Sequence, residues 1–106
     1  MATFLVQFSY TEQGLKGLLK EGGTKRREAT EQLIKSLGGR LVGYYFAFGE
    51  YDGFVIAEGL ENADAAAASL TAAASGAVRT KTTVLLTPEE VDRASKKSVT
   101  YRPPGG

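Results

Sequence analysis

Two apolar runs, Leu41 to Phe48 and Phe54 to Ala57, are separated by the short segment Gly49 to Gly53. Both runs are apolar at odd and at even positions, and side chains along a strand alternate between the two faces of a sheet. The pattern therefore predicts a β-hairpin over residues 40–59 with both faces removed from water. Two or three helices can cover only one face of a small sheet, so the other face is expected to contact another subunit.

The N-terminal part predicts one strand and two helices. Residues 3–10 alternate between strongly apolar and more polar positions, which is typical of a strand. Leucines at helical spacing follow, and the glycines among them predict a short or imperfect helix. Thr24 is the expected N-cap of a helix over residues 25–37, which the pair Gly38-Gly39 ends.

The C-terminal part predicts a helix, a fourth strand and a terminal helix. Asn62 is the expected cap of an alanine-rich helix that runs to about Ser75, and alanine side chains let a helix approach a sheet closely. Residues 78–86 alternate as a strand. The run Thr87-Pro88-Glu89-Glu90 forms a capping box with proline at the first helical position, and this helix is expected to end near Ser95.

The order β-α-β-β-α-β predicts an α+β fold of the ferredoxin-like split βαβ type, with an antiparallel sheet in the order 4-1-3-2. Residues 1–95 are expected to form this domain with its short C-terminal helix, and residues 96–106 an extended tail. The helices cover one face, so we expect two copies to pair through the bare face. Tyr45 is expected to face the partner or the helices, and replacing Leu41 and Tyr45 with aspartate is expected to break the assembly. An edge-to-edge trimer of the same unit is the alternative.

The amino-acid composition argues against several classes of function. The chain has 106 residues, of which 42% are hydrophobic, and a net charge of +1, which argues against nucleic-acid binding through bulk charge. It contains neither cysteine nor histidine, which excludes thiol chemistry and a haem held by histidine. No cofactor and no metal site are predicted. No apolar run is long enough to cross a bilayer, and residues 1–8 read as the start of a strand and not as a signal-peptide pattern, so we expect no membrane association and a cytoplasmic location.

Three stretches carry a resemblance to a known family. Gly49-Glu-Tyr-Asp52 follows an aromatic strand, Ser36 to Gly43 precedes it, and Val78 to Glu90 comes after it. Together they resemble the GYD domain family over roughly residues 3–95, with Glu50 separating Gly49 from Tyr51. The resemblance implies a dimeric α/β barrel and no known activity. Related families in that group include antibiotic-biosynthesis-type monooxygenases and chlorite dismutases, and fold alone does not fix function.

Two places are candidate ligand sites. Strands one and two of this topology run in the same direction, so the 49–53 turn is expected near the end of strand one and the start of strand four. Aromatic side chains on the hairpin can line a pocket between sheet and helices or between two sheets. The residues that these arguments select are Tyr10, Tyr44, Glu50, Tyr51, Asp52 and Arg79. The alternative is that Asp52 and Gly53 serve only the turn, that the aromatic side chains are ordinary core and interface, and that Arg79 protects an edge strand.

A third place is a candidate anion site. Lys25, Arg26 and Arg27 crowd the start of a helix, where cations are unfavourable, and Gly22 and Gly23 offer free backbone N–H groups just before it. The alternative is a solvated basic helix start balanced by nearby glutamates.

Three function classes follow. The preferred one is a cytoplasmic homo-oligomer that binds a small organic ligand without catalysis. The second is a cofactor-independent enzyme resembling the antibiotic-biosynthesis monooxygenases, with Asp52 or Glu50 as base, Tyr51 or Tyr10 orienting the substrate and Arg79 stabilising negative charge. The third is a signalling module that binds an anion between Gly22 and Arg27.

Overall fold

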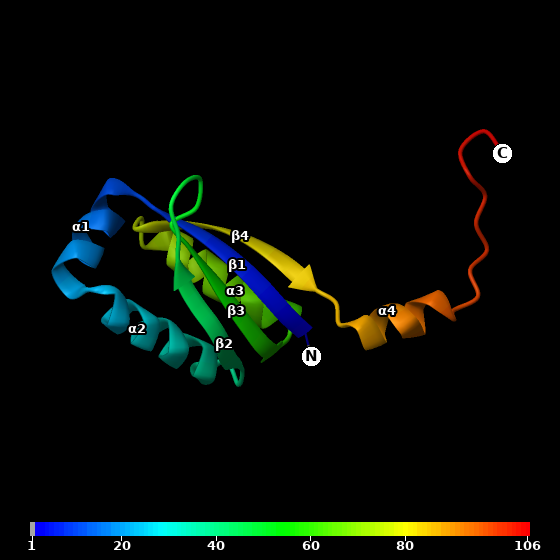
Figure 1. Ribbon diagram of the computed structural model, residues 1–106, viewed down its shortest axis with the longest axis horizontal. Coiled ribbons are helices and arrows are strands. Elements are labelled where there is room, and N and C mark those ends of the chain that lie inside the picture. Colours follow the sequence, from blue (N-terminus) through cyan, green and yellow to red (C-terminus); the bar gives the residue numbers. More distant parts are fainter. Residues whose placement is uncertain (1) are drawn as a thin grey trace.

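The computed structural model describes residues 2–106 and contains one antiparallel sheet with helices on one face (Figure 1). The strands are β1 (Ala2–Tyr10), β2 (Arg40–Phe46), β3 (Gly53–Leu60) and β4 (Val78–Leu85). Their order β2-β3-β1-β4 is the predicted order 4-1-3-2 read from the other edge. The helices are α1 (Glu12–Glu21), α2 (Gly23–Ser36), α3 (Asn62–Ala74) and α4 (Pro88–Ser95). The predicted ferredoxin-like α+β fold is confirmed.

Two predicted helix caps are wrong and one is confirmed. Helix α2 begins at Gly23, so Thr24 lies inside it, and its N-cap is Gly22 with a φ of 90°, a conformation that other residues rarely adopt. Helix α3 is capped by Glu61, whose backbone N–H donates to the carboxylate of Asp64. The Thr87 capping box of α4 is present as predicted, and the Thr87 backbone N–H holds the pKa of the Glu90 carboxyl below its usual range.

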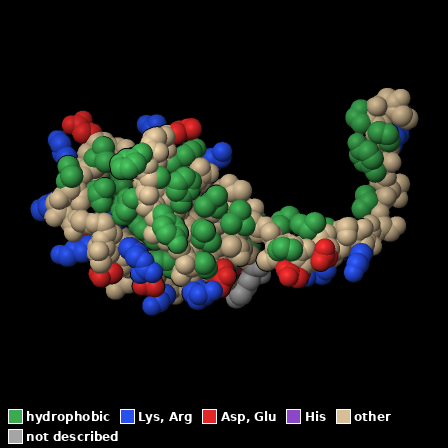
Figure 2. Space-filling view, viewed as in Figure 1, with side chains coloured by type: hydrophobic (Ala, Val, Ile, Leu, Met, Phe, Trp, Pro, Cys, Tyr) green, Lys and Arg blue, Asp and Glu red, His purple; other side chains and the backbone are tan. Residues whose placement is uncertain are grey.

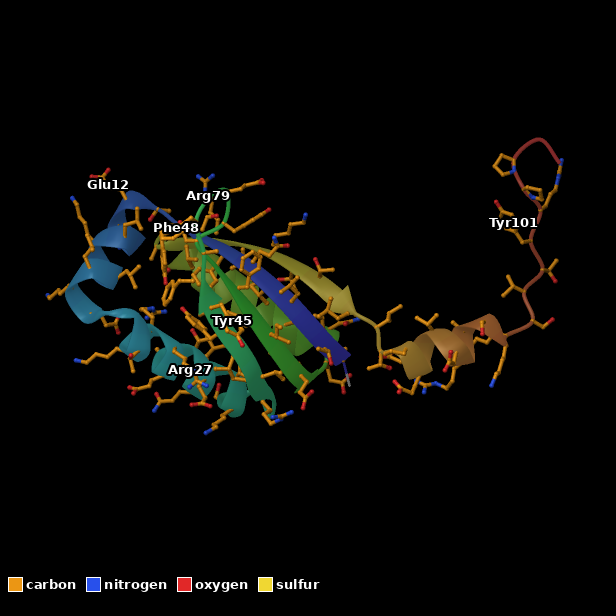
Figure 3. All side chains as sticks on the ribbon, viewed as in Figure 1. Glu12, Arg27, Tyr45, Phe48, Arg79 and Tyr101 are labelled. Carbon is orange, nitrogen blue, oxygen red and sulfur yellow. The ribbon has the colours of Figure 1, made fainter. Side chains whose placement is uncertain are left out.

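A β-bulge in β2 changes which side chains share a face. Leu41 pairs with Ala57, whereas Gly43 already pairs with Ile56, so Val42 is an extra residue in the strand. Leu41 and Tyr45, the two residues whose replacement was expected to break the assembly, therefore do not share a face. Leu41 is 6% exposed and belongs to the core, whereas the Tyr45 side chain is 65% exposed on the opposite face (Figure 3). Strand β2 also ends at Phe46, two residues earlier than the predicted run.

The core lies between the sheet and helices α2 and α3. Its buried members are Phe4, Phe8, Ile34, Leu41, Val55, Ala57, Leu60 and Ala65. No helix covers the opposite face, which Figure 1 shows toward the viewer. On this open face Leu5 pairs with Ile56, and Phe54 pairs with both Gln7 and Tyr45. Figure 2 shows hydrophobic side chains gathered there, so much of the open face is apolar, although Gln7 and Thr83 also lie on it.

Helix α4 and the residues after it extend away from the rest of the chain (Figure 1). The radius of gyration is therefore 16.9 Å, whereas a compact chain of this length has about 13 Å. Residues 96–106 contain neither helix nor strand. Among the helices of residues 2–106, none is long and apolar enough to cross a membrane.

Gly53 is expected to tolerate no side chain, because it lies against the aromatic core. A Cβ atom there would overlap the Phe8 ring and lie 2.6 Å from the Tyr45 carbonyl oxygen. Gly53→Ala should therefore lower the free energy of unfolding by about 1–3 kcal/mol in urea denaturation. Gly17→Ala is the control, since a Cβ at Gly17 meets no atom within 4 Å, and there stability should rise by up to about 1 kcal/mol. Equal effects of the two substitutions would contradict the packing argument.

Candidate functional site

A cavity of about 550 Å³ lies between the inner face of the sheet and helices α1, α2 and α3. Its aromatic wall comes from the sheet, where Phe8 contacts the rings of Tyr10 and Tyr44 at centroid distances of 5.4 and 5.6 Å. The helix walls are built largely from small residues. Those that line the cavity are Gly14, Gly17, Ala65, Ala68, Ser69 and Ala72. The volume is within the usual range for sites that bind small organic molecules.

A few polar groups reach this apolar cavity. The side chains of Tyr10, Tyr44, Arg26 and Thr30 all line it. Burial and the adjoining Tyr10 hydroxyl raise the pKa of Tyr44 well above its usual range, although Arg26 and Thr30 act in the opposite direction. The Tyr44 phenol is therefore neutral at physiological pH and can donate a hydrogen bond to a ligand.

The three predicted anion-binding cations do not come together at one point. Arg26 lines the cavity and forms an ion pair with Glu21 at 3.6 Å. Arg27 pairs instead with Glu31 along the exposed side of α2, also at 3.6 Å. Lys25 is exposed and does not line the cavity. Of the three, only Arg26 is in place to meet a ligand in the cavity.

The 49–53 turn lies at the end of β1, as the topology predicted, but outside the cavity. The Asp52 carboxylate accepts a hydrogen bond from the Tyr10 backbone N–H at 2.7 Å, and the Asp52 N–H donates to the Phe8 carbonyl at 2.8 Å. Glu50 is exposed, and its carbonyl oxygen accepts a hydrogen bond from Ser9. Tyr51 is half-buried and, like Glu50 and Asp52, does not line the cavity. The turn thus connects the β2–β3 hairpin to the end of β1 through hydrogen bonds.

Arg79 lies on the other face of the sheet from the cavity. It pairs in register with Ser9, whereas its neighbours Val78 and Thr80 pair with Tyr10 and Phe8 and line the cavity. Arg79 is exposed on the edge strand β4, at the same end of the sheet as Phe48 (Figure 3). The structure therefore separates Arg79 from the hydroxyls of Tyr10 and Tyr44.

The small residues of α1 and α3 were the part of the site that sequence reasoning missed. Alanine in α3 was expected to bring the helix close to the sheet. Instead Ala65, Ala68 and Ala72 leave space between helix and sheet, and this space is the cavity. The signal was present in the sequence, since a helix with one large apolar side chain, Leu70, cannot fill a core. Leu70 itself is 71% exposed.

Fold and cavity together define a ferredoxin-like domain with an open sheet on one side and a ligand-sized cavity on the other. The chain matches the GYD domain over residues 4–95 and belongs to the GYD domain family. No curated protein and no solved structure matches the chain. Within residues 2–106 there is no cluster of three acidic side chains that could hold a metal ion.

Proposed function

We propose that this protein is a homodimer, paired through its open sheet face, that binds a small organic molecule in the inner cavity without transforming it. The observation that carries the proposal is the cavity of about 550 Å³ inside a domain this small. The space lies between the sheet and the helices, is lined mostly by apolar side chains and has the dimensions of a small-molecule site.

The lining favours a ligand that is mainly apolar and carries one acidic or hydrogen-bond-accepting group. Phe4, Phe8 and Val55 offer an apolar surface on which water is poorly held. Arg26, which also pairs with Glu21 at 3.6 Å, and the Tyr44 hydroxyl provide a cation and a donor at the same cavity, and a ligand carboxylate would compete with Glu21 for the guanidinium. Small aromatic carboxylates have both features, so they are the class of ligand that the cavity chemistry favours.

Binding without catalysis is favoured by the placement of the carboxylates. A general base must come within hydrogen-bonding reach of the proton that it removes. Glu50 and Asp52, the proposed bases, lie outside the cavity. Glu21 is the one carboxylate among the described residues that line it, and Glu21 is paired with Arg26.

Pairing through the sheet is supported by the open face. Its central side chains Leu5, Phe54 and Ile56 are only partly covered within one chain, and Tyr45 is mostly exposed. Adjoining apolar side chains of this kind mark interaction surfaces. A two-fold dimer needs only one such self-complementary surface.

The first test is native mass spectrometry of the protein as purified from cells. We expect a dimer that carries a reproducible extra mass, and we expect benzoate, as a simple aromatic carboxylate, to raise the melting temperature. Arg26→Met should weaken benzoate binding at least tenfold, because the cation that meets the carboxylate is lost. Lys25→Met is the matched control and should bind like the wild type. A dimer with no extra mass and no response to aromatic carboxylates would contradict ligand binding.

A further inference from the structure

The C-terminal arm, residues 86–102, extends away from its own domain and does not pack on it (Figure 1). Helix α4 follows β4 directly and extends beyond the end of the sheet (Figure 1). Isolated helices shorter than about 12 residues are marginal in water, and their stability in proteins comes mostly from packing. Helix α4 has only 8 residues. Its capping box closes one end but provides no packing, so a stable α4 needs a surface to lie on.

The arm presents an apolar side that nothing covers in the described chain. Its large apolar residues are between 51% and 76% exposed, and they are Leu86, Val91, Val99 and Tyr101. Figure 2 shows hydrophobic side chains on the arm and on the sheet in the same view, so both surfaces are open to one partner on that side.

The charges of helix α4 and of β4 are complementary, since α4 contains three acidic residues and one basic residue. Glu89 and Asp92 project from α4, whereas Arg79 and Lys81 lie on the open face of the edge strand β4. Within residues 2–106 no ion pair involves any of these four side chains. They do not meet within one chain, because the six steps along β4 from Arg79 to Leu85 span about 20 Å and the four from Lys81 span about 13 Å. Helix α4 then continues away from the end of the sheet (Figure 1).

We propose that the arm of each copy docks on the edge strand β4 of the second copy, which extends the dimer proposed above and rests on it. In this dimer the two sheets stack face to face, and the two-fold axis lies between them and perpendicular to their strands. This axis places the two β4 strands next to each other and antiparallel. The arm that leaves the C-terminal end of one β4 then passes the N-terminal end of the other. Glu89 of one copy meets Arg79 of the partner subunit, and the apolar side of the arm covers the rim of the sheet interface.

Cross-linking between copies tests the docking, and the chain contains no cysteine of its own. Full-length Glu89→Cys and Arg79→Cys chains are mixed and treated with a short bismaleimide. We expect covalent dimers whose linked peptides contain both substituted positions. A mixture of Glu89→Cys with Lys16→Cys is the matched control and should give background cross-linking only, since Lys16 is exposed on α1 and away from the sheet face.

A charge swap adds an equilibrium readout. Glu89→Lys with Asp92→Lys should raise the dimer dissociation constant about tenfold, and adding Arg79→Glu with Lys81→Glu in the same chain should restore it. Arm docking is overturned, and the sheet dimer retained, if light scattering shows a dimer while the Glu89 and Arg79 positions link no more than the control. A monomeric wild-type protein at micromolar concentration would overturn both proposals.

Discussion

Replacing Tyr45 with aspartate is expected to convert the proposed dimer into folded monomers. Tyr45 is 65% exposed in one chain and stands beside Phe54 on the open face. A carboxylate buried there without a partner costs about 3 kcal/mol, and a two-fold interface contains it twice. The total of about 6 kcal/mol corresponds to roughly a 10⁴-fold increase in the dissociation constant. Sedimentation or light scattering across a concentration series measures this shift.

The control for this substitution is Leu70→Asp on the helix side of the molecule. Leu70 is 71% exposed and belongs to α3, which lies behind the sheet in Figure 1. The Leu70→Asp substitution introduces the same charge at an equally exposed apolar position away from the proposed interface. The dimer dissociation constant should therefore stay unchanged. Circular dichroism should show both variants folded. If Tyr45→Asp dimerises as tightly as the wild type, the open face is not the interface.

The fold could be predicted from sequence because its signals are local and agree with one another. Period-two alternation in β1, glycines after α2 and the capping box at Thr87 each place an element boundary to within a few residues. The resulting order of elements then selects one topology. The wrong caps show the limit of this reasoning. Thr24 and Asn62 both have side chains that cap helices, but Gly22 and Glu61 were one or two residues earlier and took the position.

Counting alternate residues along β2 could not predict which face of the sheet each side chain occupies. Counting every second residue from Tyr45 puts Leu41 on the open face, and that count holds only for a regular strand. The bulge at Val42 adds one residue, so Leu41 turns into the core while Tyr45 stays outside. No residue type in Leu41-Val-Gly marks a bulge uniquely, although Gly43 is consistent with one. A double substitution of Leu41 and Tyr45 with aspartate would therefore place a charge in the core at Leu41 and destabilise the monomer itself.

The cavity was harder to predict than the fold because it depends on which side chains are absent. Tyr10 and Tyr44 were selected for their hydroxyls, and both line the cavity, together with Arg26 from the separate anion hypothesis. The predicted partners of Tyr10 and Tyr44 do not join them. Asp52 uses its carboxylate to hold the Tyr10 backbone N–H, and Arg79 lies across the sheet. Residue spacing predicts at which end of the sheet a residue lies. The role of its side chain depends on hydrogen bonds to other segments, which spacing does not predict.

Filling the cavity with Ala68→Phe is expected to abolish ligand binding while leaving the fold intact. Ala68 lines the cavity from α3, and about 550 Å³ of space can take a phenyl ring without displacing the core. Burying that ring should add about 1–2 kcal/mol to the free energy of unfolding. The ring would also occupy the space that a ligand needs. We expect the retained mass to disappear in native mass spectrometry and benzoate to lose its effect on the melting temperature.

Ala67→Phe separates the cavity from the helix itself. Ala67 is the preceding residue of α3, is exposed and does not line the cavity. Both substitutions replace alanine with the same weaker helix former, so their helix-propensity losses of about 0.5 kcal/mol are equal. The difference between the two variants therefore measures occupation of the cavity alone. If Ala68→Phe retains the same mass as Ala67→Phe, the ligand binds elsewhere. If Ala68→Phe is the less stable of the two variants, the space beneath α3 is too small for a phenyl ring. It is then also too small for the proposed aromatic ligands.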